Sequence, residues 1–178
     1  MTDRILRSAA MSMALCFALL PPATARQWNP DTRGAAAEYT QIIHAKPNGE
    51  FVFLWWAVPE AFPNDANTQV LKDVLSRYVF VGIAHGRNNG TGLSFDNIPD
   101  LRIADAMGRQ MSPIPANSAP EVTQTLNALQ ALQSPMRQGM HWFVFEGSST
   151  HSCTPGKLSV PFAGETYTFD TPIPGCQK

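Results

Sequence analysis

Two uninterrupted apolar runs constrain the fold of this 178-residue chain more than any other feature. Residues 51–58 are apolar without a break and rich in aromatic and β-branched side chains, and residues 79–84 repeat that character. A strand with one face in solvent alternates apolar and polar side chains, so unbroken runs of this length indicate strands that are buried on both faces. Residues 51–58 are therefore the expected centre of a β-sheet that other layers cover.

A helical pattern lies between the two runs. Apolar residues recur at helical spacing from Val70 to Tyr78, and charged residues occupy the other positions. Strand, helix and strand within about 35 residues is the usual size of a right-handed parallel crossover. We therefore expect a βαβ unit in a mixed sheet, with both strands ending at the same edge.

The rest of the chain predicts further elements of one α/β domain that covers residues 26–178. This length of roughly 150 residues is typical of a single core. The remaining expected elements are a helix at 31–45, a β-hairpin at 101–114 that turns at Gly108, a helix opened by the capping box Ser118 and Glu121, a strand at 140–145, and a hairpin at 158–169 that turns at Ala163-Gly164.

Residues 1–25 have the pattern of a secretory signal peptide. Arg4 and Arg7 form a basic region, an uncharged apolar run follows at 8–20, and small residues precede a cleavage site after Ala25. A membrane-spanning helix needs about 20 apolar residues and this run offers roughly 13, so we expect no stable membrane anchor. The prediction is a periplasmic or secreted protein.

The cysteines agree with export. Cys16 would leave with the signal, and Leu15 before it does not suit lipid attachment, so Cys153 and Cys176 remain. An even count in an oxidising compartment predicts one disulfide. A redox-active pair usually sits two residues apart at a helix start, so we expect a structural bridge that tethers the C-terminal hairpin.

Charge restricts the partners. Removal of residues 1–25 leaves 11 basic and 13 acidic residues. Without a basic excess the chain has no electrostatic basis for binding nucleic acid or anionic lipid. We also find no motif for a cofactor, and none is expected.

Polar residues follow both apolar runs and form the candidate site. Glu60 follows the first run, which ends at residue 58, and His85, Arg87 and Asn88 follow the second run, which ends at residue 84. The carboxyl ends of parallel strands share an edge, which is the preferred ligand position in open sheets. His85 with Glu60 or Asp96 would form an acid–base pair, and Arg87 would hold an anion. The alternative is that Gly and Asn here only shape a solvated loop.

Two further constellations are weaker. A hydrolase built on Ser94 with the same histidine and Asp96 lacks the second glycine of a nucleophile elbow. His141, His151 and Cys153 do not have the spacing of metal ligands, and the cysteine is already assigned to a disulfide. No metal site is expected.

Trp55 and Trp56 must point to opposite faces of their strand, because the side-chain period of a strand is two. Core packing of both rings is the favoured interpretation. In the alternative, Trp56 contributes an exposed aromatic ring to a partner surface, where Trp is enriched among the residues that dominate binding.

Three short segments also carry a resemblance to a known family. They are Phe-Leu-Trp-Trp-Ala at 53–57, Ile-Pro-Asp-Leu at 98–101 and Asp-Ala-Met-Gly at 105–108. Together with the order of elements, they resemble the strand before the active-site loop, the proline step and the hairpin turn of the thioredoxin superfamily over residues 51–132.

The resemblance has two implications for function. The paired cysteines of the family would fall near Glu60 and Pro63, and neither is a cysteine, so no thiol chemistry is implied. Pro99 would be a cis proline that lines a groove for an extended polypeptide.

These observations predict an exported, non-catalytic domain that recognises a protein or peptide. The expected binding residues are Trp56, Glu60, His85, Arg87, Asn88 and Pro99. The alternative is an exported enzyme that uses His85 with Glu60 or Asp96 on a small substrate.

Overall fold

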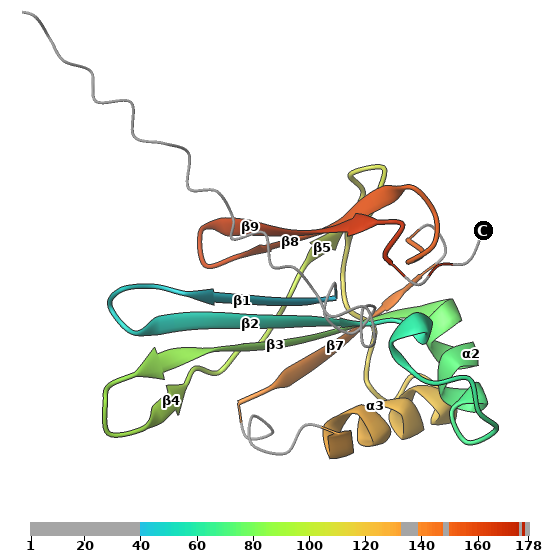
Figure 1. Cartoon of the computed structure of the whole chain (residues 1–178), viewed down its shortest axis with the longest axis horizontal. Helices are drawn as coiled ribbons and strands as arrows, with labels where there is room; N and C mark the ends of the chain where they lie inside the picture. Colours follow the sequence, from blue (N-terminus) through green and yellow to red (C-terminus); the bar gives the residue numbers. More distant parts are fainter. Residues whose placement is uncertain (1–39, 133–138, 148–149, 175, 177–178) are drawn as a thin grey trace, which may run out of the picture.

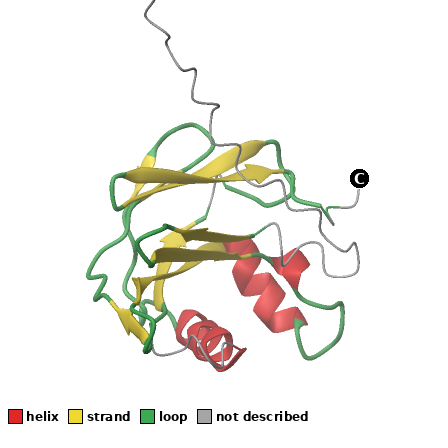
Figure 2. Cartoon of the chain, turned by 60° about the vertical axis from the view of Figure 1, so that its left-hand side comes forward, coloured by secondary structure: helices red, strands yellow, loops and turns green. Residues whose placement is uncertain are grey.

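The chain folds into three layers (Figure 1). The computed structural model describes residues 40–132, 139–147, 150–174 and 176. A five-stranded sheet, here sheet A, lies in the middle, a four-stranded sheet, sheet B, covers one face, and two helices cover the other (Figure 2). The mixed α/β composition that the sequence predicts is confirmed.

Sheet A is antiparallel throughout. Its strands are β1 (Gln41–Ala45), β2 (Glu50–Ala57), β3 (Tyr78–Asn88), β4 (Leu93–Phe95) and β7 (His141–Glu146). The order is β1-β2-β3, and β4 and β7 pair with different stretches of β3. Strand β3 is therefore the strand on which the sheet is assembled.

Sheet B is smaller and is also antiparallel. It has the order β6-β5-β8-β9. Its strands are β5 (Ile103–Ala104), β6 (Gln110–Met111), β8 (Gly156–Phe162) and β9 (Glu165–Thr171). Both predicted hairpins lie here, with Gly108 at φ 77° in the first turn and Ala163 and Gly164 at φ 50° and 81° in the second.

The predicted parallel βαβ unit is wrong. Strands β2 and β3 pair antiparallel, with Trp56 opposite Val81. Helix α2 (Gln69–Arg77) has nine residues and spans about 14 Å, whereas the eight residues of β2 span about 27 Å. The connection at residues 58–77 does not return the chain along the sheet, so β3 starts at the end where β2 finishes.

The predicted helix at 31–45 is wrong where the structure describes it. Residues 41–45 form the edge strand β1, whose side chains alternate between half-buried and exposed. Ile42 and His44 face inward, and β1 pairs with β2 along its whole length. Pairing with a buried strand overrides the local helical spacing. Residues 31–39 lie outside the described residues.

Both faces of β2 are buried, as the apolar run predicts. On one face, Trp56 packs on Phe169 of sheet B, with ring centroids 5.9 Å apart. On the other, Trp55 packs under the helical layer against Trp142, at 5.5 Å. The exposed fractions of Trp55 and Trp56 are 8% and 2%, so the prediction that both tryptophans belong to the core is confirmed.

The helical layer closes the second face of sheet A. The predicted helix after the capping-box sequence is confirmed as α3 (Pro120–Leu132). It buries Val122, Leu126 and Leu129 against the face of sheet A that carries Phe53 and Phe80. A short 3₁₀ helix, η1 (Pro59–Ala61), links β2 to the loop before α2.

The predicted disulfide is present between Cys153 and Cys176, whose Cα atoms are 5.2 Å apart. It ties the tail after β9 to the segment before β8. The predicted signal at residues 1–25 lies outside the described residues. Among the helices that are described, none combines the length and the apolar character required to cross a membrane.

Candidate functional site

Three hairpin turns gather at one end of the molecule, which we name the hairpin end (Figure 1, left). They join β1 to β2, β3 to β4 and β8 to β9, at residues 46–49, 89–92 and 163–164. The disulfide and α2 lie at the opposite end. The hairpin end therefore brings both sheets together around charged side chains.

His85 lies at the centre of this end. It is on β3, on the face toward sheet B, and its ring meets Phe162 edge to face at 5.4 Å between centroids. Nδ1 lies 2.7 Å from Asp96 Oδ2, and Nε2 lies 3.3 Å from Glu50 Oε1. Both ring nitrogens therefore face a carboxylate, so neither is free to act on a substrate in this structure.

Glu50 is held as a carboxylate by its neighbours. Lys46 Nζ donates a hydrogen bond to Glu50 Oε1 at 2.9 Å, and Asn48 Nδ2 donates to Oε2 at 3.4 Å. The hydrogen bond from Lys46, then those from His85 and Asn48, lower the pKa of Glu50 from 4.5 to about 2. The same contact with Glu50 raises the pKa of Lys46 above 10.5.

The charged groups continue into sheet B. Glu165 of β9 lies 2.9 Å from His44 Nδ1 and 3.4 Å from Lys46 Nζ. Tyr167 Oη lies 3.3 Å from the same histidine nitrogen, and burial, followed by the charge of Glu165, raises the pKa of this tyrosine. Side chains of both sheets thus form one connected polar cluster.

An open hollow of about 390 Å³ lies beside this cluster, and we name it the hairpin hollow. It is lined by Glu50, His85, Gly86, Arg87, Ser94 and Asp96. Ser94 Oγ donates to the backbone carbonyl of Arg87 at 3.3 Å and has no hydrogen bond to the histidine in the described structure. The serine nucleophile considered from the sequence therefore has no base to activate it here.

The structure brings some of the predicted site residues together and separates others. His85 and Asp96 are in contact, and Arg87 and Asn88 continue the same strand, as expected. Glu60 lies at the opposite end of the molecule, because β2 and β3 are antiparallel. The expected pairing of Glu60 with His85 is therefore wrong.

Two other predicted binding residues are not among those that line the hairpin hollow. Trp56 is buried between the sheets. Pro99 is exposed on the segment that crosses from β4 to β5. The cis peptide bond of the described chain precedes Pro172, so the cis geometry expected at Pro99 is not found.

Sequence reasoning missed Glu50 and Lys46. The segment Pro47-Asn48-Gly49 between them was an available signal, because Asn-Gly between two apolar stretches is a strong indication of a hairpin. Gly49 has φ 82°, as such a turn requires. Interpreted as the end of a helix, the same residues gave no reason to place Glu50 beside His85.

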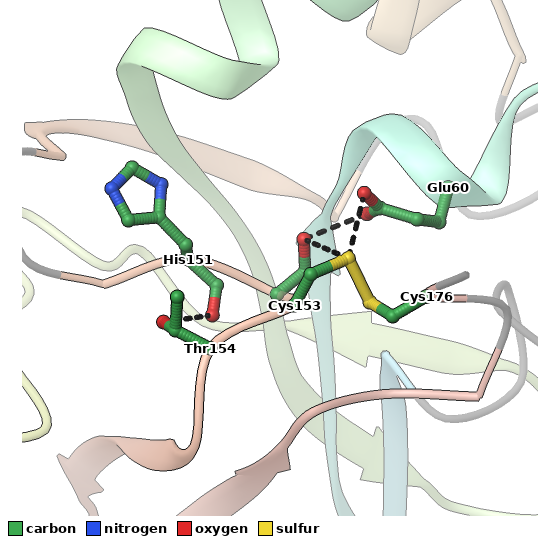
Figure 3. The surroundings of a disulfide bond; sticks show 6 residues. Glu60, His151, Cys153, Thr154 and Cys176 are labelled. Carbon is green, nitrogen blue, oxygen red and sulfur yellow. Dashed lines mark hydrogen bonds between the residues drawn. A yellow bond between two sulfur atoms is a disulfide. The ribbon is translucent and has the colours of Figure 1, made fainter. Parts of the chain in front are cut away.

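The disulfide end holds a second group of polar side chains (Figure 3). Glu60 Oε2 accepts a hydrogen bond from Ser152 Oγ at 2.7 Å, and Oε1 lies 3.2 Å from Cys153 Sγ. The ring of His151 points away from the sulfur atoms. Glu60 and the two cysteines are close enough to surround an ion, but sulfur atoms joined to each other cannot be thiolate ligands.

Next to these groups is a partly open pocket of about 170 Å³, which we name the disulfide cavity. Its walls come from the end of β2, from η1 and α2, from the start of β3 and from residues 150–153. Glu60 and the buried Trp56 both line it, so two of the predicted binding residues share this cavity rather than the hairpin hollow.

The fold and its two polar ends define a disulfide-bonded α/β domain with a β/β/α layer order. Comparison with protein-family models, with curated proteins and with solved structures found no match. The resemblance to the thioredoxin superfamily therefore stays a prediction.

Proposed function

We propose that this chain is an exported, non-catalytic domain that binds a protein or peptide partner at its hairpin end. Signal-like residues at 1–25 and a disulfide between Cys153 and Cys176 support the export part of the proposal. The hairpin turns support the binding part, because loops on a rigid scaffold are the usual carriers of recognition residues.

The hairpin hollow is the observation that carries this proposal. It is open, and it offers the Arg87 guanidinium as a donor and the Asp96 carboxylate as an acceptor, while the Ser94 hydroxyl, which donates to the carbonyl of Arg87, keeps its lone pairs as a further acceptor. Arg87 is exposed and forms no ion pair with any residue that the structure describes. An unpaired guanidinium binds carboxylates through two parallel hydrogen bonds, so the expected partner presents an acidic side chain or a C-terminal carboxylate.

His85 has a supporting role in this proposal. Its contacts with Glu50 and Asp96 link β2, β3 and the segment after β4. This linkage holds the walls of the hollow in place before a partner arrives. A preorganised surface loses less conformational entropy on binding and therefore binds more tightly.

The binding proposal can be tested by affinity capture from the exported fraction of the cell, with the purified protein as bait. Arg87→Ala should weaken capture of a specific partner by about tenfold or more, the effect of losing a charged anchor in an interface. Arg102→Ala is the matched control, since Arg102 is also exposed but pairs with Asp100 on a different segment. Equal capture by both variants would contradict the proposal.

An exported enzyme is the second candidate, and the 2.7 Å contact between Asp96 and His85 favours it. An orienting carboxylate on Nδ1 is what a histidine base requires. In that case Glu50 must move away from Nε2 when substrate binds. Activity would then disappear in His85→Gln, whereas the binding proposal predicts no turnover with any substrate.

A further inference from the structure

We propose that the disulfide cavity is a separate binding site for a primary alkylammonium group. The chemistry is that of a short amine or of a lysine side chain, both of which carry –NH₃⁺ on an apolar chain. This inference concerns the end of the molecule opposite the hairpin hollow and does not depend on the proposed function.

A buried hydroxyl without a partner is the first indication of a ligand. Thr150 lines the cavity and is 6% exposed, and its Oγ1 has no hydrogen-bond partner within the described part of the chain. A buried hydroxyl without a partner is unfavourable, and native structures contain few of them. Oγ1 itself is covered by protein atoms, and rotation of the Thr150 side chain, which lines the cavity, would bring it to a ligand N–H group.

The carboxylate of Glu60 indicates that the ligand carries a positive charge. Glu60 lines the same cavity, and its described contacts are the Ser152 hydroxyl and a disulfide sulfur atom. No lysine, arginine or histidine forms an ion pair with Glu60 in the part of the chain that the structure describes. A cation would therefore gain a charge-assisted hydrogen bond that no protein group provides.

The lining residues and the volume of the cavity indicate the chemical character and the size of the rest of the ligand. Trp56, Val58, Leu75 and Tyr78 give the cavity an apolar and partly aromatic lining, which suits a hydrocarbon chain. The volume of about 170 Å³ is between five and six times the ~30 Å³ that one water occupies. A molecule of about five non-hydrogen atoms, such as n-butylammonium, matches this space.

A bare metal ion is a poorer match. The two sulfur atoms nearest Glu60 are bonded to each other, so the cavity offers one carboxylate, neutral hydroxyls and His151, whose ring points away from the sulfur atoms (Figure 3). Divalent cations in proteins need several charged or strongly polar ligands. An ammonium group needs only hydrogen-bond acceptors, and Glu60 and Thr150 are acceptors.

The test is a titration of the oxidised protein with n-butylammonium chloride near pH 7, followed by two-dimensional NMR of backbone amides. Saturable shifts are expected around residues 150–153 and 58–60, with none at the hairpin end. Butyrate and 1-butanol have the same chain with negative or no charge and should bind at least tenfold more weakly. Equal binding of the three compounds, or no saturable shift with n-butylammonium, would overturn the proposal.

Variants locate the site. Glu60→Gln removes the charge but keeps an acceptor for Ser152, and it should weaken n-butylammonium binding by about tenfold or more. Thr150→Val is nearly isosteric and should weaken binding several-fold, while Asp170→Asn, on the exposed face of β9, should leave it unchanged. Unaltered binding in Glu60→Gln would contradict the assignment, and the amide spectrum of each variant reports whether it folds.

The two sources of the ammonium group can be separated in the same assay. If a lysine side chain is the natural occupant, Nα-acetyl-lysine-N-methylamide should compete with n-butylammonium at similar concentration. If a free amine is the occupant, the lysine derivative should fail because its backbone cannot enter. Either result supports an alkylammonium site and identifies its source.

Discussion

Nδ1 of His44 lies 2.9 Å from Oε2 of Glu165, and this contact joins the edge strand of sheet A to the edge strand of sheet B. Both side chains are 39% exposed, so the contact is partly screened by water. The contact matters because it connects the two sheets rather than because of its energy. It closes the hairpin end between β1 and β9, beside the cluster that holds His85.

Glu165→Gln should lower the free energy of unfolding by no more than about 1 kcal/mol, the range for partly exposed ion pairs. The measurement is urea denaturation near pH 6 at low ionic strength. Because salt screens such pairs, the difference from wild type should shrink in about 1 M NaCl. A loss that is as large at high salt would show that Glu165 acts through packing instead.

Acid should weaken the hairpin end through Glu50. Its pKa of about 2 in the folded chain lies below the ordinary 4.5, because Lys46 donates to the ionised form. The carboxylate therefore stabilises the fold above pH 4.5, and this contribution is lost as the pH falls from 4.5 toward about 2. Glu50→Gln should be less stable than wild type at pH 7 and should lose less stability across that interval.

Thermal unfolding at several pH values between 7 and 2 measures this effect. Glu146→Gln is a suitable control, because Glu146 is exposed on β7 and forms no ion pair among the described residues. It should follow the wild-type curve. If Glu50→Gln and wild type run parallel over the whole interval, the account of Glu50 is wrong.

A side chain at Gly86 should disrupt the packing of β3 and β4 beside the hairpin hollow. A Cβ atom there would collide with the backbone carbonyl oxygen of Ser94 and lie 3.2 Å from the Cα atom of Phe95. Gly86→Ala should therefore push β4 away from β3 and cost about 1–3 kcal/mol. The displacement should also break the contact between Asp96 and His85.

Gly92→Ala is the matched control for this prediction. Gly92 is in the turn between the same two strands, and a Cβ atom there meets nothing within 4 Å. Its stability should stay within about 0.5 kcal/mol of wild type. Equal stability of the two variants in chemical denaturation would contradict the close packing of β3 and β4.

The disulfide should contribute substantially to stability. It joins residues separated by 23 positions, and closing a loop of this size corresponds to about 3 kcal/mol in the chain-entropy model. The double variant Cys153→Ser, Cys176→Ser should unfold at correspondingly lower denaturant concentration. Under reducing conditions the wild-type protein should approach the variant, and an unchanged midpoint would show that the bridge adds nothing to the fold.

The sequence allowed the element types to be predicted better than their arrangement. The apolar run at 51–58 is buried on both faces because sheet B covers one and the helices cover the other. Strand direction is not encoded in such a run. An antiparallel and a parallel return differ in whether the connection at 58–77 runs back along the sheet, and this depends on element boundaries, the least certain part of a sequence-based prediction.

The same error limited the prediction of the site. His85 is on β3, and Asp96, 11 positions further along the chain, directly follows the paired strand β4, so local reasoning could place them together. Glu60 and Glu50 exchange roles when β2 runs antiparallel to β3, since the opposite end of β2 then faces His85. One wrong strand direction therefore replaced the true carboxylate neighbour with a residue at the far end of the molecule.

The proposal that the hairpin end binds a partner is tested most directly by photo-crosslinking in the exporting cell. A photoreactive amino acid at Asn88, at the end of β3, should form a specific crosslink to one protein or peptide. The same group at Asp170, on β9 away from the hairpin turn, should not form it. A crosslink lost on Arg87→Ala is the predicted result, and identical or absent products from both positions would contradict the account.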